Sequence, residues 1–265
     1  MHKWGWPLAV AIAAILGAIV TWIAVSPRVA SVPVPAGEWD QVFEDSFDGP
    51  EVIGPSGGQW GAYSGQPGGN QWGLWKPANV SIGGGQMTLK TTREGSNWVT
   101  GGAGNRTVQM FGRWEVRMRM PNSPSVKFVV QLWPEGTWPP EIDFAEGGGK
   151  SKVTDGFSAY MHWGTPADQK TGSKLQTVNR LTGIDMNDWH DVGVMWRPGS
   201  LQYTIDGRVW ATVNGPNVPA ENMWLAIQTE GVVPAKASDP QPPNMEVDNV
   251  KIWKWKPAAG ATPSK

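Results

Sequence analysis

The sequence predicts an all-β domain built as a two-sheet sandwich. Glycine (34 residues) and proline (23 residues) are frequent in the 265-residue chain, which is typical of many short turns. Several short segments alternate apolar and polar residues with the period of two that strands require, and few long helical periods occur outside the N-terminus. Short strands at this spacing favour two packed sheets over a helical or α/β arrangement.

The N-terminus precedes this domain. An uncharged apolar run of 19 residues extends from Pro7 to Val25, after Lys3, and a helix of that length crosses a hydrocarbon core. We therefore expect residues 1–25 to form a hydrophobic helix outside the domain, either a cleaved signal peptide or a membrane anchor. Both alternatives place the domain outside the cell, secreted or membrane-anchored. Residues 26–36, rich in Pro and Val, indicate an extended linker, and residues 258–265 a flexible tail.

The expected domain covers residues 37–257, enough chain for one sizeable core. Alternation predicts strands at 86–92, 113–120, 158–163, 191–196, 201–205, 209–213 and 247–253. Asp206-Gly207 lies between two of these segments and predicts a tight hairpin turn.

Composition excludes some classes of function. The net charge of −1 without a basic patch argues against nucleic-acid binding. The absence of cysteine excludes disulfides, thiolate metal sites and a cysteine nucleophile. The chain has 18 Trp against 3 Tyr and 6 Phe, and an indole face suits the apolar face of a pyranose ring. We expect about two thirds of these rings to pack in or around the core and a handful to line a sugar cleft.

The segment 141–146, Glu-Ile-Asp-Phe-Ala-Glu, is the strongest candidate site. In a regular strand Glu141 and Asp143 share a face, whereas Glu146 points to the other one. One extra residue, a β-bulge around Phe144 or Ala145, would bring Glu146 back beside them. Three like charges on one surface are costly to desolvate, which favours a functional site. The hexapeptide alone also fits an exposed amphipathic edge strand.

Ordered landmarks accompany this segment: Trp133-Pro134, Trp138-Pro139-Pro140, the run 111–121, Val42-Phe43-Glu44-Asp45-Ser46-Phe47, Met161-His162-Trp163-Gly164, Trp189-His190, Tyr203-Thr204-Ile205-Asp206-Gly207 and Val247-Asp248-Asn249-Val250. With them, the chain from about Trp39 to Trp255 resembles glycoside hydrolase family 16, in its bulged E-x-D-x-x-E subgroup of laminarinase-like and β-glucanase-like enzymes. The resemblance implies a concanavalin-like β-jelly roll with a concave sugar-binding face.

The resemblance also implies roles for the carboxylates. Glu141 is then the nucleophile of a retaining endo-β-glycosidase, Glu146 the acid/base, and Asp143 a residue between them that hydrogen-bonds the nucleophile. A negative Glu141 and apolar neighbours such as Phe144 would keep Glu146 protonated for its first step. The residues themselves allow either glutamate either role. Pro140 stands where the family usually has a small residue, and we expect it to begin the strand.

Other residues are candidates for substrate binding. Trp133 and Trp138 precede Glu141 and are the best stacking candidates, with Trp163 third. His162 could bond the acid/base or a sugar hydroxyl, or be a core histidine. Arg117 could reach sugar hydroxyls or a catalytic carboxylate, or form a surface salt bridge. Asn70 and Trp75 lie in a Gly-rich segment, 64–76, that could wall the cleft.

The chemistry requires no cofactor. The family often holds a structural calcium away from the active site; here Asp248 matches the family's aspartate and Gly85 could donate a carbonyl, although Ser46 replaces a glutamate.

We therefore expect a monomeric hydrolase of an extracellular β-1,3- or mixed-linkage glucan, in contact with a membrane only if residues 1–25 are retained. A galactan hydrolase, a transglycosylase, a non-catalytic carbohydrate-binding protein and a wall-anchored structural protein are the alternatives.

Overall fold

The computed structural model describes residues 32–33, 38–49, 58–68, 71–170 and 175–257. The predicted N-terminal helix, most of the linker, Asn70 and the C-terminal tail lie outside these residues. Among the described residues, no helix has the length and apolar character needed to cross a membrane.

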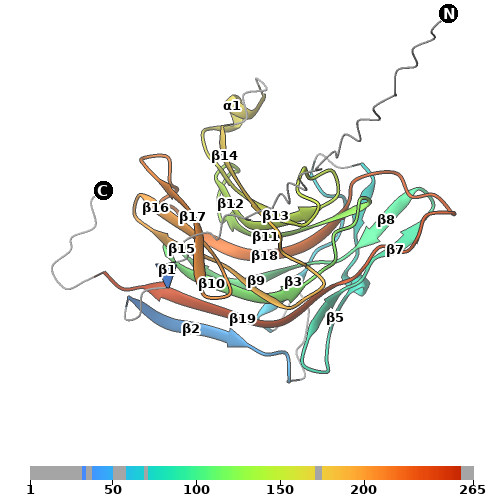
Figure 1. The fold of residues 1–265 in the computed structure, drawn as a ribbon, viewed down its shortest axis with the longest axis horizontal. Coiled ribbons are helices and arrows are strands. Elements are labelled where there is room, and N and C mark those ends of the chain that lie inside the picture. Colours follow the sequence, from blue (N-terminus) through green and yellow to red (C-terminus); the bar gives the residue numbers. More distant parts are fainter. Residues whose placement is uncertain (1–31, 34–37, 50–57, 69–70, 171–174, 258–265) are drawn as a thin grey trace, which may run out of the picture.

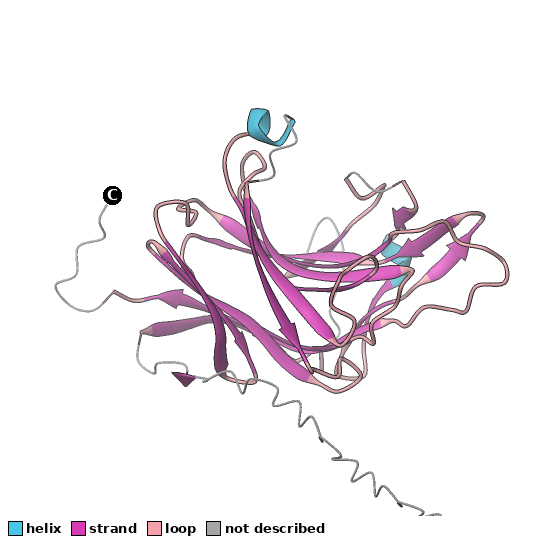
Figure 2. Ribbon diagram, turned by 45° about the horizontal axis from the view of Figure 1, so that its top comes forward, coloured by secondary structure: helices cyan, strands magenta, loops and turns pink. Residues whose placement is uncertain are grey.

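The described part of the chain forms two large antiparallel sheets packed face to face, as Figures 1 and 2 show. The first has nine strands. Eight follow the order β1 (Val32–Pro33), β17 (Arg208–Asn214), β16 (Ser200–Ile205), β15 (His190–Arg197), β10 (Gly112–Arg119), β19 (Met245–Trp255), β6 (Met87–Leu89) and β5 (Val80–Ile82), and β2 (Trp39–Asp45) also pairs with β19. We call it the outer sheet.

The second, seven-stranded sheet has the order β14 (Gln176–Thr182), β13 (Gly156–His162), β12 (Glu141–Gly148), β11 (Val126–Pro134), β18 (Met223–Gly231), β9 (Gly102–Gln109) and β3 (Trp60–Ala62). We call it the cleft sheet. A small third sheet joins β4 (Gly73–Trp75), β8 (Asn97–Thr100) and β7 (Thr92–Glu94). The described helices are two short ones, a 3-10 turn at Pro77–Asn79 and α1 at Pro166–Lys170. The predicted all-β sandwich is confirmed.

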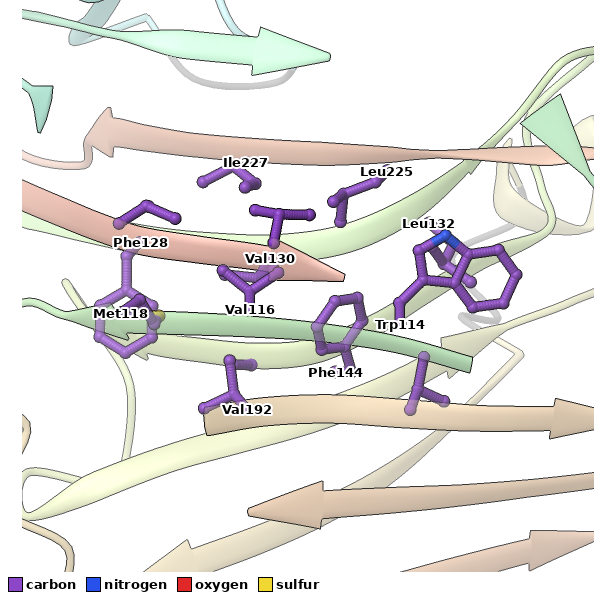
Figure 3. Close-up of a cluster of buried hydrophobic side chains, with 14 of the residues drawn as sticks. Trp114, Val116, Met118, Phe128, Val130, Leu132, Phe144, Val192, Leu225 and Ile227 are labelled. Atoms are coloured by element: carbon purple, nitrogen blue, oxygen red, sulfur yellow. The ribbon is translucent and has the colours of Figure 1, made fainter. Parts of the chain in front are cut away.

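The core lies between the two large sheets and fixes which residues face the cleft. Trp114, Val116 and Met118 of β10 are fully buried against side chains of the cleft sheet, including Phe144 of β12 (Figure 3). Burying each such side chain contributes about 1.5–3 kcal/mol. Because side chains alternate along a strand, the residues between the core positions of β11, β12 and β18 point to the opposite, concave face.

Most predicted strands agree with the structure to within a few residues at each end. The Asp206-Gly207 turn is also confirmed, since both residues have positive φ (47° and 71°), as a type I′ hairpin requires. The single strand predicted at 86–92 is wrong. The segment is divided into β6 of the outer sheet and β7 of the third sheet. At the division Asn79 donates its amide to the carbonyl of Lys90 and to the hydroxyl of Thr92 (both 3.0 Å).

Candidate active site

The candidate site begins with the bulge in β12. On neighbouring β11, Val130 pairs with Ala145 and the next residue, Gln131, pairs with Asp143, so Phe144 is the extra residue. The pairing with β13, on the other side of β12, also shows the extra residue. Asp143 pairs with Tyr160 and Glu146 pairs with Ser158, so three residues along β12 correspond to two along β13. The predicted bulge is confirmed. Pro140 also behaves as expected, because β12 begins directly after it.

The bulge places Glu141, Asp143 and Glu146 on the same face of the cleft sheet. Directly paired residues share a face, and three rows of pairs cross the sheet at this point. Their members are His162 beside Glu141, Tyr160 and Gln131 on either side of Asp143, and Ser158 and Val129 on either side of Glu146. The core-facing Ile142 and Phe144 are fully buried on the opposite face.

Glu141 and Glu146 line a cleft of roughly 850 Å³, and Asp143 is buried between them along the strand. Its aromatic residues are Tyr63, Trp75, Trp133, Trp138 and Trp224. Trp75 is anchored by donating its indole N–H to the Thr229 carbonyl (2.9 Å). Trp224 packs over Gly104 of β9, where a Cβ would lie 2.5 Å from the indole ring. The structure places Trp75, Trp133 and Trp138 in the cleft lining, where the sequence predicts them, and adds Trp224 and Tyr63, which the sequence did not indicate.

Glu141 has two donors. The indole N–H of Trp138 donates to Glu141 Oε2 (2.5 Å). The Gln131 amide is assigned with its nitrogen toward the carboxylates, because this orientation gives both its nitrogen and its oxygen suitable partners; it then donates to Glu141 Oε1 (2.7 Å) and to Asp143 Oδ1 (2.9 Å). On the other side of Asp143, His162 Nε2 lies 3.4 Å from Asp143 Oδ2. His162 is therefore a neighbour of the carboxylates, as predicted, and its Nε2 faces Asp143.

Burial and mutual repulsion determine the protonation of these groups. Burial, the charge of Asp143 and a hydrogen bond with Asp143 raise the pKa of Glu141 well above its ordinary value, against the opposing effects of His162 and Trp138. Burial, together with the charge of Glu146, raises the pKa of Asp143 to about 7. Glu141 and Asp143 interact directly, so they titrate as a pair. A buried acid pair with raised pKa values in a cleft is typical of a catalytic site.

The cleft also holds polar residues that the sequence analysis missed. Lys127, Gln131, Gln228 and Glu230 line it beside the carboxylates. The alternation of β11 indicates two of these positions. Lys127 and Gln131 are four residues apart, so they share one face of the strand, and buried apolar residues lie on the other face. A polar residue inside an otherwise apolar strand indicates a sheet with a second, functional face.

Two predicted binding residues lie elsewhere. Arg117 is on the outer sheet, where its guanidinium is 3.4 Å from Asp191 and 3.4 Å from Asp248, so it forms surface ion pairs and does not reach the cleft. Trp163 packs against the hydrophobic core and is not part of the cleft lining, because it follows β13 in the core-facing register of Met161. For Arg117 the alternative of a surface salt bridge is confirmed and the contact with the cleft is not, whereas the prediction that Trp163 stacks on a sugar in the cleft was wrong.

The predicted calcium site does not fit the described residues. The Asp248 carboxylate faces the Arg117 guanidinium, a cation that repels a dication at the same oxygen. No group of three or more His, Asp or Glu side chains suited to a metal occurs in the described part of the chain. Gly85 has positive φ (79°), and the atom nearest to its Cβ position is Oδ1 of Asp48 (3.3 Å).

Comparison with known proteins agrees with this geometry. Residues 69–251 match the model of the family "Glycosyl hydrolases family 16". The chain belongs to this family.

Among curated relatives, the chain is 27% identical over 121 residues to the endo-1,3-1,4-beta-glycanase ExsH of Rhizobium meliloti (strain 1021). This match covers 45% of the chain and 24% of ExsH. The chain is 29% identical over 180 residues to a beta-glucanase of Bacillus licheniformis, covering 63% of this chain and 70% of that protein. Its fold resembles the endo-beta-1,3-glucanase of Pyrococcus furiosus, with a TM-score of 0.68, 18% identity, and coverage of 86% of this chain and 99% of that chain.

Proposed function

We propose that the chain is a retaining endo-β-glycosidase that hydrolyses a β-1,3- or mixed-linkage glucan through a covalent glycosyl-enzyme. One observation carries the proposal: the bulge in β12 places Glu141 and Glu146 in the lining of a cleft that also holds tryptophans, with Asp143 buried between them on the same strand. The relatives whose names mention β-glucan support the substrate class.

The chemistry follows from the two glutamates. Glu141 attacks the anomeric carbon while Glu146 protonates the departing glycosidic oxygen, and water, deprotonated by Glu146, then releases the sugar from Glu141. The Trp138 N–H and the Gln131 amide hold the Glu141 carboxylate in one orientation before the attack. The cleft tryptophans offer flat apolar faces for successive pyranose rings.

The test is a panel assay of the purified protein on laminarin, lichenan, agarose and carrageenan, with product analysis. We expect oligosaccharides from laminarin or lichenan whose new reducing ends first appear as the β-anomer by NMR, because retention requires two displacements. Glu141→Gln should lose nearly all of this activity, whereas Glu44→Gln on the outer sheet should retain it.

Other results would change the proposal. Products only from agarose or carrageenan would make the chain a galactan hydrolase, and elongated products would indicate transglycosylation. Binding to a glucan by calorimetry without any product would indicate a carbohydrate-binding protein. An active Glu141→Gln variant would exclude Glu141 as the nucleophile.

A further inference from the structure

Lys127 forms ion pairs with two carboxylates that line the cleft. It lies on β11, and its Nζ is 3.7 Å from Glu146 Oε2 and 3.5 Å from Glu230 Oε2. Glu230 comes from β18, directly across from Lys127 in the register of the two strands. The ammonium group therefore bridges the proposed acid/base and a fourth carboxylate.

The arrangement is partly buried and held from several sides. Only 25% of the Lys127 side chain and 8% of the Glu230 side chain is exposed. The Gln228 amide donates to Glu230 Oε1 (2.7 Å), which leaves Oε2 directed at Lys127. Gly149 packs beside the Lys127 stem, where an added Cβ would lie 3.1 Å from Lys127 Cβ. A partly buried lysine held between two carboxylates differs from a fully solvated surface ion pair, whose contribution is small.

We propose that Lys127, shared between Glu146 and Glu230, is a positioning residue that orients the Glu146 carboxyl and sets the pH at which it gives up its proton. The inference rests on the proposed function, in which Glu146 is the acid/base. Glu230 moderates the effect, because it competes with Glu146 for the same ammonium group. The pair thus balances the two duties of Glu146, proton donor in the first step and proton acceptor in the second.

Other charged groups face this cluster from the neighbouring strands. Asp143 and Glu141 lie on β12 itself, Tyr160 and His162 on β13, and Arg180 on β14 is paired with Ser158 in the same row as Glu146. Burial by itself would lower the pKa of Lys127, but the charges of Glu230, Glu146, Asp143 and Glu141 together raise it. Lys127 therefore stays positively charged at every pH at which the activity would be measured, and it acts as a fixed charge.

Substitutions at Lys127 and at Glu230 should shift the alkaline limb of the activity–pH profile in opposite directions. Lys127→Met removes a cation that favours ionised Glu146, so the alkaline limb of the activity–pH profile should move up by about one pH unit. Glu230→Gln removes the competing anion and leaves Lys127 to Glu146 alone, so the same limb should move down by about one unit. Lys127→Arg keeps the charge and should retain a limb close to that of the wild type.

A matched pair of controls lies on the outer sheet. Lys251 and Glu44 are also 3.5 Å apart, on the adjacent strands β19 and β2. Lys251→Met and Glu44→Gln make the same charge changes far from the cleft, so neither should move the alkaline limb. Activity would be measured as kcat/KM against pH on a soluble glucan oligosaccharide, with thermal unfolding of every variant.

A second readout does not need turnover. In the full protein labelled with ¹³C at glutamate carboxyls, the Glu146 signal is assigned by its loss in Glu146→Gln, and its titration midpoint should move in the same two directions. If the wild type shows no turnover, the proposed function fails while this titration still tests the pair. Shifts of the same sign, or no shift in either variant, would overturn the inference.

Discussion

At the scale of single residues, the site depends on opposing influences on Glu141. Burial and Asp143 raise its pKa, whereas the N–H of Trp138 favours its ionised form. As the proposed nucleophile, Glu141 acts only when ionised. The acid limb of the activity–pH profile should therefore lie well above the ordinary range of a glutamate.

Two variants should move this profile in opposite directions. Asp143→Asn removes a carboxylate whose charge and hydrogen bond raise the pKa of Glu141, so the acid limb should move to lower pH, with a loss of rate. Trp138→Phe keeps an aromatic face but removes the donor to Glu141, so the acid limb should move to higher pH. The measurement is kcat/KM against pH. Limbs that move together in both variants would mean that neither residue acts through Glu141.

At the scale of elements, the site depends on how β12 ends. After the bulge and Glu146, the strand finishes at Gly148, which has a φ of +74°. A Cβ at this position would lie 2.7 Å from the Val126 carbonyl oxygen of β11. Glycine is thus required both by the backbone conformation and by the close approach of the neighbouring strand. In the register of β11 against β12, Gly148 pairs with Lys127 and Asp143 pairs with Gln131.

Gly148→Ala should therefore destabilise the protein by about 1–3 kcal/mol, from positive φ and the clash together. Gly183→Ala is the matched control, because Gly183 has nearly the same φ (+75°) but open space around its Cβ position. Chemical denaturation of both variants would separate the two effects. Equal losses of stability would show that the approach of β11 contributes nothing.

At the scale of the whole molecule, the site is maintained at the expense of stability. Asp143 is only 2% exposed, and its carboxyl has a pKa of about 7 in the fold against 3.8 ordinarily. A carboxyl whose folded pKa is raised stabilises the fold below its unfolded pKa, and this contribution is lost as pH rises through the folded pKa. The window of decline is therefore about pH 4 to pH 7.

Asp143→Asn should remove this dependence. At pH 8 the variant should be more stable than the wild type by about 2–4 kcal/mol, and the difference should vanish near pH 4, where both side chains are neutral. Unfolding by denaturant at several pH values measures it. Asp40→Asn, at an exposed ion pair on the outer sheet, should show no comparable pH dependence. A pH-independent difference for Asp143→Asn would contradict the raised pKa.

The sequence by itself determined the all-β fold, the strand of the three carboxylates and its bulge. These features are local: alternation with a period of two reports which face of a strand is buried, and the spacing of Glu141, Asp143 and Glu146 requires one extra residue for a shared face. The tryptophans at 133 and 138 were predictable for the same reason, because they adjoin that strand in the chain.

Only the tertiary structure decided which distant side chains meet there. Gln131, Lys127 and Glu230 join the site through the pairing of β11 with β12 and β18, strands whose order in the sheet no local pattern records. Long-range pairing also decides the position of Arg117. Its strand, β10, pairs with β15 and β19 in the outer sheet, so Arg117 forms ion pairs with Asp191 and Asp248 and does not reach the cleft. Local periodicity determines which side chains of a strand face the core. Which side chains of other strands lie beside them depends on the register of long-range pairing, and the packing of the whole core selects that register.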